Sequence, residues 1–269
     1  MKTFNRPPIT EPANFDTFIK YRQQPLRTNL KEAKKVVSYR YNKYKALMPE
    51  VQRIHLHKVD KDHKDALSYI YHDYTCKAVK TFRKTLFDHV PKCPYCGIDS
   101  SVHLDHYLPK GTFPEFYLYS LNLIPICEPC NTKYKKAIYS KNGFRVFIHP
   151  YHDQLNAYEF LKATLSVQMG VVKIDYRVIQ APGISHDMFH VIKRHFKELQ
   201  LQQRYLKHAT TYLGDMKDRW TGNVDVRRRS LESSYRDALA EYGYNHWKTA
   251  LLKNAYTNTD FIVNGIPLL

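Results

Sequence analysis

The sequence predicts an α+β fold on two observations. Helix-forming stretches with regularly spaced hydrophobic residues occupy both ends of the chain. Short strand-like segments lie between them, and the clearest, "LSVQMGVVKIDYRV" at 165–178, alternates hydrophobic and polar residues in its second half. Helices and strands that are segregated along the chain in this way are typical of α+β proteins.

The composition indicates a folded, strongly basic chain. With 269 residues, of which 43% are hydrophobic, it is long enough for one large domain or two small ones. The formal net charge of +17 favours a polyanionic partner such as nucleic acid, although a basic surface can also simply be solvated. No stretch is apolar over about 18 residues and the start lacks a signal-peptide core, so we expect a soluble, cytoplasmic protein with no membrane partner.

The N-terminal part is expected to be an extended arm followed by helices. Residues 1–27 show little periodicity and contain four prolines, and such a segment is a candidate for binding a partner. These prolines are Pro7, Pro8, Pro12 and Pro25. A helical region is expected over 28–90, with one helix over about 28–48 and a second over about 63–90, which contains no Gly or Pro and is ended by Pro91.

The C-terminal region, 151–269, is expected to contain a hairpin and then helices. The hairpin should turn near Met169 and Gly170. From about residue 185 the hydrophobic residues return to helical spacing. Those that we expect on the inner faces of these helices are Phe189, Ile192, Phe196 and Leu199, and then Tyr235, Leu239 and Tyr242.

Four of the five cysteines form two Cys-x-x-Cys pairs, "CPYC" at 93–96 and "CEPC" at 127–130. In a reducing compartment, such pairs indicate metal ligands before they indicate disulfides. Four thiolates suit tetrahedral Zn²⁺, and a closed four-cysteine shell leaves no open position for substrate, so this zinc should be structural. The ligands would be Cys93, Cys96, Cys127 and Cys130. Cys76 lies among helix formers and is expected to be a small core residue.

The residues framed by these pairs carry a motif. "CPYC" is followed by "HLDHYLPK" at 103–110 and by "NLIPICEPCNTKYKK" at 122–136. This pattern resembles the HNH family of nucleases over about residues 91–150, roughly a fifth of the chain. The resemblance implies a ββα-metal core, a β-hairpin and a helix around one catalytic cation, stabilised here by the four-cysteine zinc site and flanked by helical regions on both sides.

Carried over residue by residue, the resemblance implies that His106 is the general base and that Asp105 is a metal ligand. Asn122 matches the middle Asn, which orients the histidine. Asn131 matches the last position, where many relatives have His, so the motif here is an H-N-N variant. An oxygen-only protein shell of this kind favours hard Mg²⁺ or Mn²⁺ over softer ions, and leaves open whether Asn131 binds the cation directly or through water.

This assignment agrees with the chemistry of phosphodiester hydrolysis. The reaction needs a deprotonated water, a cation that neutralises charge in the transition state, and help for the departing oxygen. A neutral histidine supplies the first, since an unperturbed imidazole pKa is about 6.5. A buried histidine beside a charge-paired aspartate is the purely structural alternative for His106 and Asp105.

Three neighbouring residues are candidates for contacting nucleic acid: His103, Lys110 and Lys133. His103 lies two positions before Asp105 on the expected strand, so both should point to one face, and His103 is the rival base or ligand. Lys133 follows Asn131 near the start of an expected helix, where it either contacts phosphate or is simply solvated.

The sequence therefore predicts a metal-dependent HNH endonuclease that cuts DNA. Structured RNA as the substrate, or a zinc-stabilised module that binds nucleic acid without cutting it, are the alternatives. The arm "MKTFNRPPITEP" followed by helices and this core is similar to the PtuB-type nucleases of Septu and retron-linked antiphage systems. That resemblance implies an antiviral defence role beside an ABC-type ATPase partner; a stand-alone restriction-type or mobile-element nuclease is the other reading.

Overall fold

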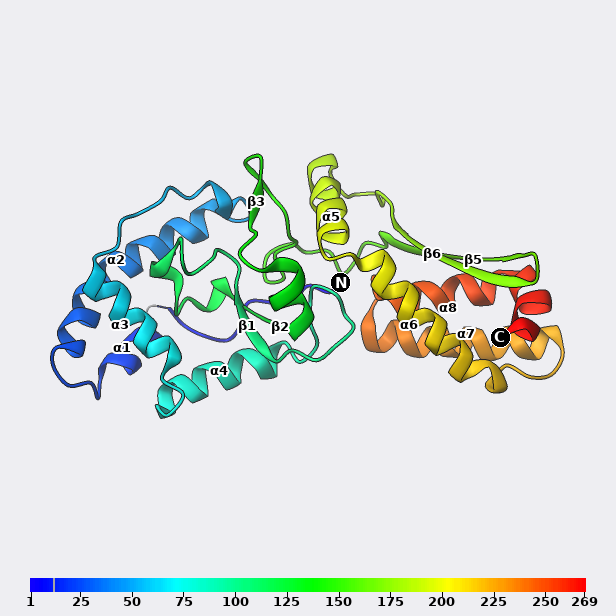
Figure 1. Ribbon diagram of the computed structural model, residues 1–269, viewed down its shortest axis with the longest axis horizontal. Coiled ribbons are helices and arrows are strands. Elements are labelled where there is room, and N and C mark those ends of the chain that lie inside the picture. The colour runs from blue at the N-terminus through cyan, green and yellow to red at the C-terminus, as the bar shows by residue number, and fades with distance from the viewer. Residues whose placement is uncertain (12) are drawn as a thin grey trace. The chain divides into compact units, whose positions relative to one another are not determined.

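The structure is a computed structural model that describes residues 1–11 and 13–269. The described chain divides into two compact units: residues 3–153, and residues 154–269 together with Met1 and Lys2. Helices and small antiparallel sheets make up both units, as Figure 1 shows, so the α+β class is confirmed. Within the described residues no helix combines the length and the apolar character that crossing a membrane requires.

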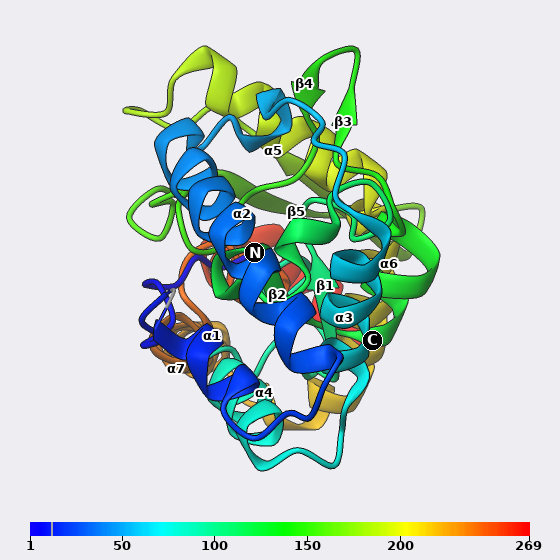
Figure 2. The same cartoon turned by 90° about the vertical axis from the view of Figure 1, so that its left-hand side faces the viewer.

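The unit 3–153 contains four α-helices and two small hairpins among its described residues. The helices are α1 (Ala13–Ile19), α2 (Leu26–Leu47), α3 (Lys61–His72) and α4 (Lys77–His89), and the strands are β1 (His103–His106), β2 (Leu123–Ile126), β3 (Ser140–Lys141) and β4 (Phe144–Arg145). β1 pairs antiparallel with β2, and β3 with β4. α4 packs against β2, while α2 and α3 pack against each other and against the 3₁₀ turn Pro114–Phe116 (Figures 1 and 2).

Aromatic rings and one buried ion pair join α2 to the loop between β1 and β2. The Tyr41 and Tyr119 rings stack with centroids 3.9 Å apart, and Tyr44 meets the edge of Tyr119 at 5.1 Å. Arg40 pairs with Glu115 at 2.8 Å in the same buried region. Because both charges are buried and paired, the loop is held at a defined position over α2.

The N-terminal segment differs from the expected arm. Residues 13–19 form α1, whose Phe15 and Phe18 are fully buried, while Pro12 lies outside the described residues. The preceding residues are irregular but pack onto the unit: the Phe4 amide donates to Pro150 O at 2.7 Å. Burial of these aromatic rings outweighs the weak helical pattern of the sequence, so this segment is part of the core.

The single helix expected over 63–90 is two helices, α3 and α4. Asp73 interrupts it: its Oδ1 accepts from the amides of Thr75 and Cys76, each at 3.1 Å, and its Oδ2 accepts from Arg22 at 2.7 Å. Hydrogen bonds from Thr75 and Arg22 lower the pKa of Asp73 to about 2, despite its partial burial. An aspartate that caps its own backbone in this way competes with helix continuation.

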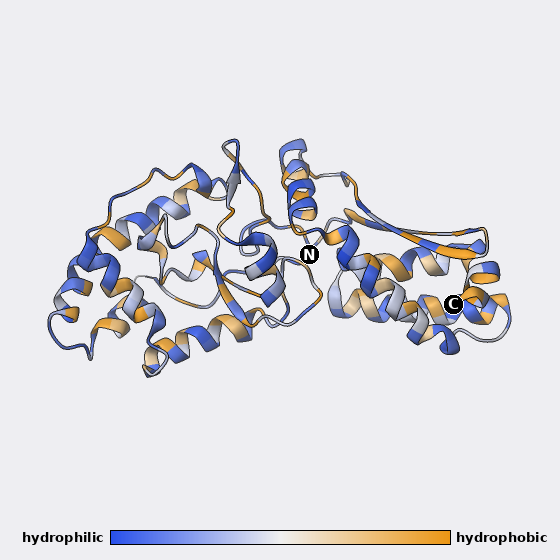
Figure 3. Cartoon of the chain, viewed as in Figure 1, coloured by the Kyte–Doolittle hydropathy of each residue, from blue (hydrophilic) through white to orange (hydrophobic). Residues whose placement is uncertain are grey.

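The unit 154–269 is a two-stranded ribbon packed on helices. It comprises β5 (Leu161–Gln168), β6 (Val171–Val178), α5 (His186–Glu198), α6 (Leu201–Met216), α7 (Val224–Tyr242) and α8 (Trp247–Thr257). The expected hairpin is confirmed, with Met169 and Gly170 at φ of 51° and 75° in a tight turn. α8 lies against β5, and Figure 3 shows hydrophobic residues along both.

Asparagine side chains close the free edge of β5. Asn245 Oδ1 accepts from the Leu161 amide at 3.1 Å, and Asn254 Oδ1 accepts from the Leu165 amide at 2.8 Å. Asn258 Nδ2 donates to the Leu165 carbonyl at 2.8 Å. These bonds replace the partner strand that an edge lacks.

One half-buried carboxyl makes the stability of the unit 3–153 depend on pH. Burial raises the pKa of Glu11 from 4.5 to about 7, although its Oε1 accepts from the Ser120 amide at 3.3 Å. Between pH 4.5 and about 7, the folded chain therefore keeps a proton on Glu11 that the unfolded chain has lost. The stability that this protonated carboxyl contributes is fully present below pH 4.5 and is lost as the pH rises through about 7. Glu11→Gln should therefore raise the free energy of unfolding above pH 7 by on the order of 1 kcal/mol, with little change below pH 4.5.

Urea titrations of both proteins at several pH values measure this difference. Glu128→Gln is the control because Glu128 is exposed and should leave the pH profile of stability unchanged. An unaltered profile for Glu11→Gln would mean that Glu11 is ionised in the folded chain.

Candidate functional site

Four cysteine sulfurs converge at the end of β2. The Sγ atoms of the two Cys-x-x-Cys pairs lie within 4.8 Å of one another, and all four residues are buried. These residues are Cys93, Cys96, Cys127 and Cys130. Cys76 is half-buried at the start of α4 and is not a member of this cluster.

The cluster has the donors and spacing of a structural metal site. Tetrahedral Zn²⁺ with bonds of about 2.3 Å places its sulfurs about 3.8 Å apart, and Cys96 Sγ lies 3.6 Å from Cys127 Sγ. The first loop is shaped for a ligand: Gly97 has a φ of 71°, which favours glycine, and the Ile98 amide donates to Cys96 Sγ at 3.4 Å. A buried four-cysteine site that can hold a metal such as zinc is therefore present, as predicted.

The hairpin β1–β2 is held directly beside this cluster, because Cys127 follows the last residue of β2. In its register Asp105 faces Ile124 and His106 faces Leu123. The chain then turns at Cys130 into the short π-helix Cys130–Lys135. The sulfur cluster thus anchors both the end of the hairpin and the start of the helical segment that follows it.

Asp105 is a buried carboxylate with one engaged and one free oxygen. Its Oδ1 accepts from Lys135 Nζ at 3.0 Å, and the same Nζ donates to the His106 carbonyl at 3.0 Å. Its Oδ2 is buried and accepts no hydrogen bond from any residue that the structure describes. Burial raises the pKa of Asp105 and the Lys135 ammonium opposes this rise. A buried oxygen without a donor is costly in a purely structural ion pair and suits a ligand.

His106 is buried, and its imidazole ring is neutral. Its Nε2 lies 3.2 Å from the Tyr117 carbonyl oxygen, which can only accept, so Nε2 carries the hydrogen and Nδ1 is left as the acceptor. Burial, reinforced by the nearby charges of Lys110 and Lys135, lowers the pKa of His106 from 6.5 to about 3. The imidazole is therefore uncharged at neutral pH.

Asn122 positions the backbone that follows His106. Its Oδ1 accepts from the Leu108 amide at 2.8 Å, and its Nδ2 donates to the Leu108 carbonyl at 3.1 Å. In addition, the Asn122 carbonyl accepts from the Tyr107 amide at 2.8 Å. This fully buried side chain thus fixes the chain just after His106 through its backbone.

The remaining predicted site residues are less buried than Asp105, His106 and Asn122. Lys110 lies near His106, with its Nζ 5.7 Å from the Tyr117 ring centroid. Asn131 is half-buried in the π-helix, and Lys133 on the same segment is exposed. His103 is half-buried at the far end of β1, opposite Ile126, two residues before Asp105.

Three residues of this site were missed by the sequence reasoning: Lys135, Tyr71 and Arg83. The Tyr71 ring lies 4.8 Å from the His106 ring, and the Arg83 guanidinium lies 5.4 Å from the Tyr71 ring. Arg83 Nη1 is buried and has no hydrogen-bond partner among the described residues. Tyr71 and Arg83 come from α3 and α4, where no local signal indicates them. Lys135 has a weak signal, because "CNTKYKK" offers several lysines one helical turn after Asn131.

Comparison with known proteins shows a distant similarity to a phage protein. Protein ea31 of Escherichia phage lambda is 26% identical over 170 residues, which cover 62% of this chain and 57% of the phage protein. The chain thus matches little more than half the length of that relative. No family model matches the chain, and no solved structure matches it.

The cysteine cluster leads to a prediction about metal content. Cys93→Ser should lose the bound metal and lower the melting temperature strongly, because metal binding to such a site contributes folding free energy. Cys76→Ser should keep both, because Cys76 lies outside the cluster. Zinc content by mass spectrometry and melting curves of the two variants check this. A Cys93→Ser protein that keeps one zinc and full stability would show that Cys93 is no ligand.

The buried ion pair leads to a second prediction. Lys135→Met leaves the Asp105 charge buried without its partner and should lower the free energy of unfolding by roughly 3–5 kcal/mol at pH 7. Lys133→Met on the same segment is the matched control and should change it by less than about 0.5 kcal/mol. Adding Asp105→Leu to Lys135→Met should restore most of the loss. Denaturant titrations that find equal stability for the two lysine variants would contradict the pairing.

Proposed function

We propose that the unit 3–153 is a metal-dependent endonuclease of the HNH type that hydrolyses phosphodiester bonds in DNA. One observation carries the proposal: a buried carboxylate oxygen without a donor, Asp105 Oδ2, stands next in the chain to a neutral histidine whose Nε2 is tied to a carbonyl. A ligand oxygen and an acceptor nitrogen on neighbouring residues are the groups that metal-assisted hydrolysis requires.

His106 is the general base in this proposal. The Tyr117 carbonyl holds the hydrogen on Nε2, so the proton of the attacking water passes to Nδ1. Asn122 keeps the backbone after His106 in place, which fixes the position of the imidazole. The low pKa keeps the imidazole unprotonated at neutral pH, and it also makes His106 a weaker base than a solvent-exposed histidine.

The cation in this proposal is a hard ion such as Mg²⁺ or Mn²⁺. Asp105 would hold it through Oδ2, with the Asn131 amide oxygen as a second donor, and oxygen donors are those that these ions prefer. When bound, such an ion supplies charge that stabilises the transition state and the departing oxygen. Lys135 already occupies Oδ1, and it partly neutralises the carboxylate, which favours a site that keeps several waters on the ion.

Cations beside His106 support an anionic substrate. Burial and the nearby charge of Arg83 lower the pKa of Lys110, and both cations stand over the Tyr71 ring. Arg83 Nη1 is a buried donor without a hydrogen-bond partner among the described residues, so the guanidinium adds positive charge beside the site. Together with the net charge of +17, these groups favour a phosphodiester over a neutral substrate.

The proposal is tested with His106→Ala. Cleavage of supercoiled plasmid DNA in the presence of Mg²⁺ or Mn²⁺ should fall by roughly 10²–10⁴-fold, the usual effect of removing a positioned base. Zinc content should stay unchanged, and free imidazole in the buffer should restore part of the activity, which separates a lost base from lost folding. His103→Ala, two residues earlier on β1, is the control and should cut like the wild type.

Three outcomes would overturn parts of this proposal. Wild-type cleavage by His106→Ala together with inactive His103→Ala would make His103 the base. Cleavage of matched RNA but not DNA would change the substrate. A wild-type chain that binds DNA but never cuts it with either ion would make the unit a zinc-stabilised binding module.

A further inference from the structure

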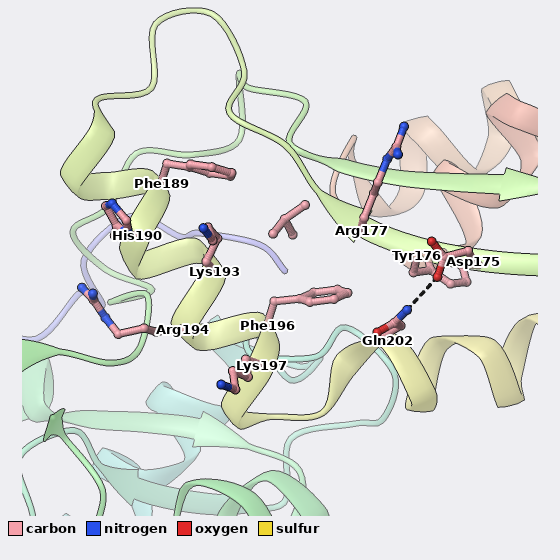
Figure 4. A pocket seen from close by; sticks show the side chains of 11 residues that line it. Asp175, Tyr176, Arg177, Phe189, His190, Lys193, Arg194, Phe196, Lys197 and Gln202 are labelled. Atoms are coloured by element: carbon pink, nitrogen blue, oxygen red, sulfur yellow. Dashed lines mark hydrogen bonds between the residues drawn. The ribbon is translucent and has the colours of Figure 1, made fainter.

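Helix α5 exposes two aromatic rings that its spacing predicts to be buried. Ile192 and Leu199 are fully buried as expected, but Phe189 and Phe196 are only half-buried. Both rings line an open pocket of about 560 Å³ between α5 and β6. In Figure 4 the two rings extend from the same side of α5 toward the strand.

The pocket is lined by cations as well as rings. Lys193 lies between the two phenylalanines on one helical face, four residues after Phe189 and three before Phe196, and its Nζ is 5.5 Å from the Phe189 centroid. Lys197 and Arg194 on α5 and Arg177 on the facing strand also line the pocket, and Figure 4 shows Arg177 across from the helix. Four basic residues thus border a cavity that a pair of apolar rings enters.

The acidic lining residue is already engaged. Asp175 Oδ1 accepts from the Gln202 side chain at 2.7 Å, as the dashed line in Figure 4 marks. The Phe196 ring packs against Tyr205, whose ring lies 6.2 Å away in an edge-on arrangement. Phe196 is therefore held by ring packing, and the local charge is positive.

We propose that this pocket binds single-stranded nucleic acid, with bases stacked on Phe189 and Phe196 and phosphates on the surrounding cations. Phenylalanine offers only a flat apolar face, which stacks on a base, while lysine and arginine at the rim attract the backbone. In a duplex the base faces are covered by their neighbours, so these rings would have nothing to stack on. An acidic peptide would satisfy the cations but would leave both rings exposed.

This site lies in the unit 154–269, and its occupancy does not depend on whether the other unit cuts DNA. The pocket would bind a stretch of single strand, whereas the proposed cleavage site acts on a single phosphodiester bond. Binding can accordingly be measured without divalent ions, under conditions in which the proposed nuclease is inactive.

The experiment measures fluorescence anisotropy of a labelled oligothymidylate of roughly 15 nucleotides with the full-length protein. Phe189→Ala and Phe196→Ala should each weaken binding by about 5- to 100-fold, the usual effect of losing one stacked base. Tyr244→Ala removes an exposed aromatic ring elsewhere in the unit and should leave the affinity unchanged.

The contribution of a cation to binding is tested with Lys193→Gln. It should weaken binding and make the affinity less sensitive to salt, because one phosphate contact is lost. Lys207→Gln is the matched control, since Lys207 is exposed on α6 outside the pocket. Melting curves confirm that each variant is folded.

Any one of three results would reject the proposal. Unchanged affinity of both folded phenylalanine variants would exclude stacking in this pocket. Equal binding of a hairpin duplex, lost equally in both phenylalanine variants, would exclude preference for a single strand. Complete displacement of the oligonucleotide by poly-glutamate at equal charge concentration would indicate an acidic polypeptide as the ligand.

Discussion

The convergence of four sulfur atoms within 4.8 Å is the constraint on which the rest of the unit 3–153 depends. The hairpin β1–β2 has only four residues in each strand, and so short a pair is marginal in water by itself. The cluster ties the segment after α4 to the end of β2, and it also marks where the π-helix Cys130–Lys135 begins. The positions of Asp105 and Lys135 follow, because they lie on the hairpin and on that helix.

The buried polar residues beside this cluster, Asp105, His106 and Lys135, are not an arrangement that stability alone favours. Asp105 and Lys135 are both buried, and the desolvation of such a pair offsets much of its Coulomb attraction. The carboxylate also keeps one oxygen without a donor, and burial lowers the pKa of His106 well below its ordinary value. A core that was selected only for packing would replace these residues with hydrophobic ones of similar volume. Their presence is the physical reason for assigning chemistry to this place.

The unit 154–269 solves a different problem, because a two-stranded ribbon has open edges on both sides. Asn245, Asn254 and Asn258 bond the backbone of β5 on one edge, so that α8 and the residues flanking it take the place of a third strand. The side chains of β6 are more exposed, and this strand with α5 forms the basic, aromatic pocket. In this hairpin β5 is thus the strand that packing stabilises, and β6 is the strand that lines the proposed binding pocket.

The sequence by itself determined the local features: the two cysteine pairs, the strand alternation and turn at Met169–Gly170, and the Asp105–His106 step, because periodicity and spacing act over a few residues. The tertiary structure alone decided the break at Asp73, which bonds to Arg22 from a distant part of the chain, and the choice of Lys135 over its neighbouring lysines as the partner of Asp105. It likewise decided that Phe196 lines a pocket although its spacing matches that of a buried residue. Burial and ion pairing depend on which segments meet in space, and that information is spread over the whole chain.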